Sequence, residues 1–486
     1  MNQLARKTLK NLLIAAVYMS IGGVVAIVGA YVAYVSARPD LQVWHEARLT
    51  AEYTADSDAT TLADYLETEK AVFQQVKTEV VDQLEAADRG IIRRFDPGSK
   101  SNPDRWPQDW NRTFELEQQT PAAGILLLHG MSDSPYSLRH FGKSLHARGA
   151  YVLGLRIPGH GTAPSGLVTA RWEDMAAAVR LAVKHTKSVV GDKPVYLVGY
   201  SNGGALSVQY AQTSLLDPSL PEVEGLILVS PAIGVSSAAA FAVWQARLGW
   251  LLRVEKLAWA GTQPEYDPFK YGSFAINAGD QAHRLTVEIR KNFANPALQP
   301  LLTRFPRVLA FQSAVDATVS TPALIMGLFD QLPANGNELV LFDINRRVVF
   351  EELLANDPRP RLVELLANRD LPFSLTVLRN TDAESDQLEI VQKAPGDTDI
   401  TLSPSNMRWP EGIFSLTHIA LPFPRDDPLY GGETLKNANH VQLGNLALRG
   451  ERGTIALTSA DMLRQRWNPF WDFMDERVVR FTGLGQ

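Results

Sequence analysis

Apolar and polar positions follow two rhythms along the middle of this chain. Short continuous apolar runs, bounded by glycine, proline or polar residues, are typical of strands that are buried on both faces of a sheet. The segments between them repeat apolar residues at helical spacing. The predicted strands are 124–130, 151–157, 195–198, 224–232 and 307–316, and the predicted helices are 137–149, 171–190 and the segment that follows Ser201. This alternation predicts an α/β domain whose mostly parallel sheet carries helices on both faces.

The pattern is harder to interpret after the fifth of these strands. Another apolar run, 338–342, is followed by residues 346–407, which contain one more strand-like run at 373–380. Two interpretations stay open for this region, because it can either extend the sheet or form an insertion.

An aromatic block at 234–300 interrupts the alternation of strands and helices. It contains Trp244, Trp250 and Trp259, and part of it has helical spacing. One interpretation is a lid inserted over the carboxyl edge of the sheet, where α/β sheets bind ligands. The other is a set of ordinary core helices with a loop. We expect a lid, because the block carries more aromatic residues than a plain crossover needs.

The apolar stretch near the N-terminus, residues 11–37, is uncharged. No charged residue lies between Asn11 and Ala37, and the apolar core of the segment is 24 residues long. About 20 residues suffice to cross the hydrocarbon of a bilayer, so we predict a transmembrane helix at 11–37. The basic residues Arg6, Lys7 and Lys10 precede it. They favour a cytoplasmic location for residues 1–10 and export of the rest of the chain.

A cleaved signal peptide is the alternative to an anchor. The tripeptide Val-Ser-Ala at 35–37 suits a signal peptidase, but the apolar stretch is longer than the usual h-region of about 7–15 residues. We therefore expect an uncleaved anchor. If the chain is bacterial, the protein is expected in the inner membrane as a single-pass protein whose large domain is periplasmic.

The composition and the remaining segments complete the expected organisation. Residues 38–114 form a polar, helix-rich segment, 115–450 the main domain and 451–486 a C-terminal extension. Among the 486 residues there is no cysteine, which excludes disulfides, a cysteine nucleophile and thiolate metal sites. The net charge is −6 and no basic stripe is present, so nucleic acid is not an expected partner. The oligomeric state is not indicated.

The segment 196–208 supplies the first candidate for chemistry. It has the pattern of a strand, a tight turn and a helix, and the turn Gly-Tyr-Ser-Asn-Gly at 199–203 matches G-x-S-x-G. In this pattern a sharp turn exposes the serine hydroxyl, and glycines suit it because a Cβ would collide with neighbouring backbone. Ser201 is therefore the candidate nucleophile, and an ordinary turn between a strand and a helix is the alternative.

A serine nucleophile needs a histidine base, and the base needs an orienting carboxylate. Asp316 ends a buried run and is expected at the same sheet edge as Ser201, although Asp343 also follows an apolar strand. With the chain order serine, acid, histidine, two histidines come late enough. His418 lies in an apolar, strand-like run, whereas His440 lies in a polar, asparagine-rich loop. We predict Asp316 as the acid and His418 as the base.

Two backbone N–H groups should stabilise the negative charge that develops during attack. One is expected from Asn202, directly after the nucleophile, and the other from the loop after an early strand. In that loop Gly130 lets the backbone turn, so the N–H of Met131 is the second candidate donor. His129 precedes Ser201 in the chain, and we expect it to organise this loop rather than to act as the base.

Together these stretches resemble the α/β-hydrolase family, most closely its monoacylglycerol-lipase and serine-aminopeptidase-like branch. The stretches are LLLHGMSDSP (126–135), RIPGHGTAPSG (156–166), GYSNGG (199–204) and SAVDATVS (313–320). The resemblance covers about 122–319 and weakens afterwards. It implies an α/β-hydrolase fold with Ser201 as nucleophile, Asp316 as acid, and Met131 and Asn202 as oxyanion donors. It adds little to the choice between His418 and His440.

The leading hypothesis is a membrane-anchored serine hydrolase that cleaves a carboxylic ester, thioester or small amide through an acyl-enzyme. Such an enzyme needs no metal ion and no organic cofactor. The anchor and the aromatic block favour a lipid-like or otherwise apolar acyl ester as substrate. The alternative is an anchored envelope protein that uses a hydrolase fold for binding or assembly.

Overall fold

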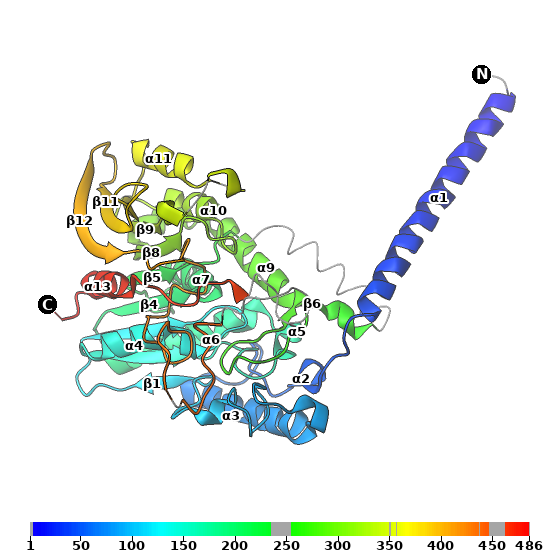
Figure 1. Ribbon diagram of the computed structural model, residues 1–486, viewed down its shortest axis with the longest axis horizontal. Helices are drawn as coiled ribbons and strands as arrows, with labels where there is room; N and C mark the ends of the chain where they lie inside the picture. Colours follow the sequence, from blue (N-terminus) through cyan, green and yellow to red (C-terminus); the bar gives the residue numbers. More distant parts are fainter. Residues whose placement is uncertain are drawn as a thin grey trace.

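A ten-stranded sheet in the order β1-β3-β2-β4-β5-β8-β9-β10-β11-β12 forms the centre of the protein (Figure 1). It is seen in a computed structural model that describes residues 3–234, 254–348, 351–355, 357–436, 438–446 and 462–485. The strands are β1 (Phe114–Leu116), β2 (Ala123–Leu128), β3 (Ala150–Leu155), β4 (Val195–Tyr200), β5 (Gly225–Val229), β8 (Arg307–Ser313), β9 (Glu338–Phe342), β10 (Ser374–Asn380), β11 (Gln387–Lys393) and β12 (Ile400–Arg408).

Parallel pairing dominates the sheet. The six pairings that connect β3 through β10 are parallel, and the pairings of β1 with β3, β10 with β11 and β11 with β12 are antiparallel. Strands β2, β3, β4 and β5 are buried along their whole length, as their continuous apolar sequences require. The predicted mostly parallel sheet is confirmed, and β10 to β12 show that residues 346–407 extend it.

Helices cover both faces of the sheet. Along β2, Leu126 and Leu128 face one hydrophobic core, and Ile125 and Leu127 face the other. The first core is covered by α3 (Leu62–Glu79), α6 (Trp172–Val190), α7 (Asn202–Leu216), α9 (Ile276–Phe293), α10 (Thr321–Gly327) and α11 (Arg359–Ala367). The second is covered by α4 (Arg139–His146) and α13 (Trp471–Thr482). Helix α13, which belongs to the expected C-terminal extension, thus packs against the sheet.

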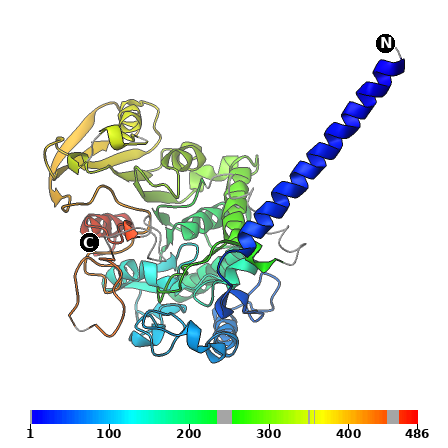
Figure 2. The same ribbon diagram turned by 45° about the vertical axis from the view of Figure 1, so that its right-hand side comes forward.

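The N-terminal helix α1 (Gln3–Ser36) projects away from the body of the molecule (Figures 1 and 2). Its stretch Lys10–Tyr34 is long and apolar enough to cross a membrane, and it is not buried against the rest of the protein. Where α1 ends, the chain is fastened to the segment after residue 253. The Lys256 ammonium donates to the Arg38 carbonyl at 2.7 Å and lies 2.9 Å from the Asp40 carboxylate.

The described part of the aromatic block, 254–300, is only partly a surface element. It contains the small two-stranded sheet of β6 (Trp259–Gly261) and β7 (Phe274–Ala275), followed by α9. Helix α9 buries Leu285, Ile289 and Phe293 in the first core, so this portion of the expected lid is a core helix. Trp259 is 2% exposed, and Trp244 and Trp250 lie outside the described residues.

Two further short α-helices in the described part of the chain are α2 (Val43–Glu46) and α5 (Gly166–Thr169). The run 412–423, strand-like in its sequence, forms turns and no strand in the structure. Its apolar residues Leu416, Leu421 and Phe423 are buried in the second core as a loop. Burial therefore explains its composition without strand pairing.

Candidate active site

A sharp turn between β4 and α7 carries Ser201. The residue has φ 53° and ψ −115°, a left-handed backbone conformation that costs a serine about 1–3 kcal/mol. The turn requires glycines because neighbouring backbone atoms leave no room for a Cβ. A Cβ on Gly203 would lie 1.9 Å from the Leu128 carbonyl oxygen, and a Cβ on Gly199 would lie 2.6 Å from that of Gly203. The glycine spacing noted in the sequence is thus a steric requirement of this turn.

Backbone strain is concentrated at one edge of the sheet. Within the described ranges, the non-glycine residues with positive φ are Ser132 (60°), Ser201 (53°) and Ser230 (42°). They follow β2, β4 and β5, which are neighbouring parallel strands, so all three lie at the same carboxyl edge. Strained backbone of this kind clusters at functional sites. The candidate site is therefore at this edge, and Asp316 follows the next strand, β8.

Asp316 and His418 form a hydrogen-bonded pair. Nδ1 of His418 lies 2.9 Å from Oδ2 of Asp316, and the two side chains are 6% and 0% exposed. Burial alone would raise the pKa of Asp316, but the hydrogen bond and charge of His418, with the N–H groups of Val319 and Thr318, lower it below its usual value. Asp316 is thus held as a carboxylate that orients the imidazole ring of His418.

The two rival residues have other partners. Asp343 is fully buried and pairs with the Arg346 guanidinium at 2.6 Å. His440 stacks on the indole of Trp106 with ring centroids 4.1 Å apart, and its Nδ1 lies 3.1 Å from the Val441 carbonyl. Neither residue takes part in the pair of Asp316 and His418.

Tyr200 connects the serine turn to the histidine. Its ring centroid lies 5.3 Å from that of His418, and its hydroxyl donates to the His418 carbonyl at 3.4 Å. In the described part of the chain, the Ser201 hydroxyl makes no hydrogen bond with His418. Catalytic hydrogen bonds are often long in the absence of substrate and shorten in the complex. The structure thus brings Asp316 and His418 together directly, with Ser201 adjoining them through Tyr200.

Two backbone N–H groups near Ser201 are available to an incoming oxygen. Asn202 opens α7, so its N–H has no intrahelical acceptor. Among the residues that the structure describes, the N–H groups of Asn202 and Met131 have no hydrogen-bond partner. A Cβ on Gly130 would lie 3.1 Å from Cβ of Ser201, which places the loop of Met131 against the serine turn. An oxyanion site requires two such backbone donors beside the nucleophile, so these two N–H groups stay the predicted pair.

His129 fixes the loop that carries Met131. The N–H of Ile157 donates to its Nε2 at 3.0 Å, so its Nδ1 carries the proton and donates to the Gly130 carbonyl at 2.9 Å. Burial lowers the pKa of His129 well below its usual value, which keeps the ring neutral. The residue thus joins the loops after β2 and β3, in agreement with the expected organising role.

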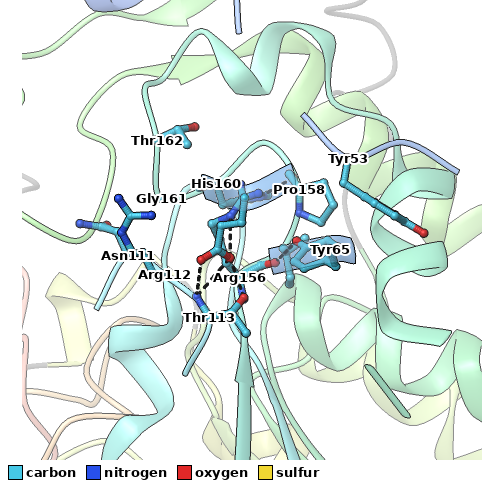
Figure 3. A network of polar contacts seen from close by, with 12 residues as sticks. Tyr53, Tyr65, Asn111, Arg112, Thr113, Arg156, Pro158, His160, Gly161 and Thr162 are labelled. Atoms are coloured by element: carbon cyan, nitrogen blue, oxygen red, sulfur yellow. Dashed lines mark hydrogen bonds and ion pairs between the residues drawn. The ribbon is translucent and has the colours of Figure 1, made fainter. Parts of the chain in front are cut away.

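A buried ion network, which the sequence analysis missed, supports the loop after β3 (Figure 3). The Arg156 side chain is 0% exposed. Its guanidinium donates to both carboxylate oxygens of Glu52 at 2.8 Å and to Oε2 of Glu69 at 3.2 Å. The Arg156 N–H donates to Thr113 Oγ1 at 3.0 Å, and the Tyr65 hydroxyl donates to the Arg156 carbonyl. Acidic and aromatic residues of the segment 38–114, called the N-terminal segment below, therefore hold the loop 156–166. This loop lies beside the candidate site.

No group of three or more histidine, aspartate and glutamate side chains within the described ranges could hold a metal ion.

Comparisons with known proteins give consistent matches for part of the chain. Residues 119–321 match the family described as "Serine aminopeptidase, S33". A thermostable monoacylglycerol lipase of Bacillus sp. (strain H-257) is 26% identical over 118 residues, which are 24% of this chain and 44% of that protein. The chain thus matches less than half the length of this relative.

Solved structures also resemble the protein over about half of its length. One is the monoacylglycerol lipase of Paleococcus ferrophilus, with 18% identity, a TM-score of 0.36 and coverage of 48% of this chain and 89% of that chain. Another is a soluble variant of the monoglyceride lipase of Saccharomyces cerevisiae in complex with a substrate analogue. It has 16% identity, a TM-score of 0.37 and coverage of 48% and 81%.

Proposed function

Since residues 119–321 match the serine aminopeptidase (S33) family, we propose that this protein is a serine hydrolase that cleaves carboxylic esters through an acyl-enzyme on Ser201. The observation that carries the proposal is the shared sheet edge. At this edge, the strained Ser201 follows β4 and Asp316 follows β8. His418 forms a buried pair with Asp316.

In the proposed reaction, Ser201 Oγ attacks the ester carbonyl while His418 takes its proton. Asp316 holds the ring and stabilises the imidazolium that forms. The N–H groups of Met131 and Asn202 receive the oxyanion, and removal of one such donor typically costs about 3 kcal/mol of transition-state stabilisation. His418 then protonates the leaving alcohol, and a water molecule, activated by the same histidine, releases the acid.

For the substrate class, we propose a lipid-like or other apolar acyl ester. The name of the Bacillus relative, monoacylglycerol lipase, supports this class. We also propose that α1 anchors the protein in a membrane. The basic residues Arg6, Lys7 and Lys10 before the apolar stretch favour a cytoplasmic N-terminus. In a bacterium this corresponds to the inner membrane and a periplasmic catalytic domain.

A fluorophosphonate probe tests the proposal, because it labels activated serines. The full-length protein in detergent should be labelled, and the Ser201→Ala variant should not. Ser207→Ala is a matched control, since Ser207 is a buried serine of α7 whose hydroxyl donates to the Gly203 carbonyl. Absence of labelling in the wild-type protein would contradict the proposal and favour an anchored binding or assembly protein.

A further inference from the structure

A cavity of about 190 Å³ lies beside the candidate site. Its wall includes Ser132, which follows Met131, and Ile419, which follows His418. One side of the cavity is therefore built from residues adjacent to a proposed oxyanion donor and to the proposed base. Its volume is below the range of about 300–1,000 Å³ that is typical of pockets for drug-sized ligands. It suits a small chemical group attached to a substrate rather than a whole acyl chain.

The cavity wall is rich in positive charge. Lys270, Arg464 and Arg466 all line it. Burial lowers the pKa of Lys270, the charges of Asp133 and Asp267 oppose this shift, and the charges of Arg464 and Arg466 add to it. Like charges gathered in a partly buried site disfavour one another. A bound anion would relieve this repulsion.

Two of the three cations, Lys270 and Arg464, have side-chain N–H donors that are not engaged by the described residues. In the part of the chain that the structure describes, the Lys270 ammonium and the Arg464 guanidinium make no hydrogen bond or ion pair. Arg466 is 5% exposed and is engaged by the side chain of Tyr266. Lys270 and Arg464 can therefore bind a ligand without losing a protein partner.

The carboxylates of the wall do not neutralise these cations by direct pairing. Asp267 accepts hydrogen bonds from the Tyr430 hydroxyl and from the N–H groups of Phe269 and Lys270, so its oxygens are occupied. Asp133 accepts from the N–H of Ser134, and burial raises its pKa to about 6. With both carboxylates ionised, the wall still carries one excess positive charge from its three cations and two acids.

The cationic part of the wall is electrostatically linked to the proposed catalytic residues. The charges of Asp133, Arg464 and Asp316 all act on the Tyr200 hydroxyl, which donates to the His418 carbonyl. The C-terminal segment also holds the histidine loop, because the Thr417 hydroxyl donates to the Gln465 carbonyl at 2.5 Å. A group bound by Arg464 would thus lie near an ester held at Ser201.

We propose that this cavity binds an anionic group, a carboxylate or a phosphate, carried by the ester that the enzyme hydrolyses. The inference rests on the proposed function and narrows its substrate class from neutral esters to negatively charged ones. Ile419, Arg464 and Arg466 lie beyond the matched residues 119–321. Lys270 lies within them, so the matched domain and the C-terminal part of the chain both contribute to the proposed preference.

Matched pairs of esters test the proposal. In the first pair, para-nitrophenyl hexanoate is compared with the mono-para-nitrophenyl ester of adipate, in which a carboxylate replaces the terminal methyl group of the acyl chain. In the second, hexanoylglycerol is compared with hexanoylglycerol phosphate, which adds a phosphate to the alcohol. For the full-length protein, kcat/KM should be about tenfold or more higher for the charged member of at least one pair. The pair that responds identifies the side of the ester that enters the cavity.

The variants Lys270→Gln and Arg464→Gln should each bring that ratio close to one. Lys291→Gln should leave it unchanged, because this lysine is 75% exposed on α9 and does not line the cavity. A wild-type ratio near one for both pairs would overturn the inference. So would ratios that Lys270→Gln and Arg464→Gln do not alter.

A binding measurement separates this inference from the proposed function. The Ser201→Ala variant cannot form an acyl-enzyme, so its affinity for the same four esters is measured by calorimetry. Tighter binding of a charged ester, lost on adding Lys270→Gln, supports the cavity even if the wild-type protein hydrolyses none of them. Equal binding of charged and neutral esters contradicts the cavity even if Ser201 is labelled by the fluorophosphonate.

Discussion

The carboxylate of Asp316 and the imidazole of His418 meet at 2.9 Å although 102 positions separate them in the sequence. The contact joins the end of β8 to a loop that follows four further strands of the sheet, β9 to β12. Because Nδ1 is engaged by Asp316, Nε2 is the ring nitrogen that is left to exchange a proton with a hydroxyl. This relationship leads to the first prediction.

His418→Ala should lower kcat on an activated ester by about a thousandfold or more, since members of a catalytic triad act as a unit. Asp316→Asn should produce a loss close to that, because the imidazole loses its orienting carboxylate. His440→Ala is the control and should stay near the wild-type rate, as its ring stacks on Trp106. Steady-state kinetics with para-nitrophenyl hexanoate measures all three. An inactive His440→Ala with an active His418→Ala would reverse the assignment.

The serine turn should not tolerate a methyl group at Gly203. A Cβ there would meet the Leu128 carbonyl at 1.9 Å, whereas a Cβ on Gly261 has nothing within 4 Å. We expect Gly203→Ala to cost about 3 kcal/mol or more, as overpacking does when backbone must move. Gly261→Ala should stay within about 0.5 kcal/mol of the wild type. Chemical denaturation of the full-length protein in detergent gives both values, and equal stabilities would contradict the steric argument.

Arg156→Met should destabilise the protein strongly. It leaves Glu69, whose side chain is 5% exposed, without its guanidinium partner, and breaking a buried ion pair typically costs about 3–5 kcal/mol. Lys70→Met is the control, because its pair with Glu67 is on the surface, with side chains 76% and 77% exposed. Surface pairs contribute about 0–1 kcal/mol. If the two variants unfold at the same denaturant concentration, the network does not hold the N-terminal segment.

Acid should weaken the attachment of the N-terminal segment through His45. Burial lowers the pKa of His45 from 6.5 to about 4, and its Nε2 lies 2.9 Å from Ser273 Oγ. The unfolded chain therefore takes up a proton that the folded chain does not, so stability falls as the pH drops from 6.5 to about 4 and levels off below that. At about 1.4 kcal/mol per pKa unit, the loss is about 3 kcal/mol.

The matched variant for this prediction is His45→Gln, which keeps a hydrogen-bonding side chain but does not titrate. Free energies of unfolding are measured by denaturant titration at pH values of about 7, 5.5 and 4. The advantage of the wild type over the variant should shrink steadily across this range. An advantage that is constant with pH would show that His45 does not titrate differently in the two states.

Local sequence signals predicted the central elements well. Strands β2 to β5 and β8 are continuous apolar runs, and Gly199 reflects contacts with Gly203, Gly204 and Ser207, which follow it within one turn and the start of α7. Such features depend on short-range sterics and on burial of both sheet faces, which leave a pattern in the sequence. The same holds for the apolar length of α1.

Features that depend on distant partners left no such pattern. In the sequence, Glu52 and Glu69 have the pattern of ordinary surface acids in a polar segment. Only folding brings them into contact with Arg156. Likewise Arg464 belongs to a segment with no recognisable motif, yet it lines the cavity beside the histidine loop. The assignment of Ser201, Asp316 and His418 as the catalytic residues stays a prediction that the kinetic experiments above address.

The pairing of Glu52 with Arg156 also sets an order of events during synthesis. The two residues are 104 positions apart, and ribosomes add about 5–20 residues per second. The N-terminal segment therefore emerges roughly 5–20 seconds before its guanidinium partner exists. During that interval its acidic residues remain in water and its apolar face lacks the sheet that buries it. This early segment thus cannot reach its final place before the loop that carries Arg156 has been made.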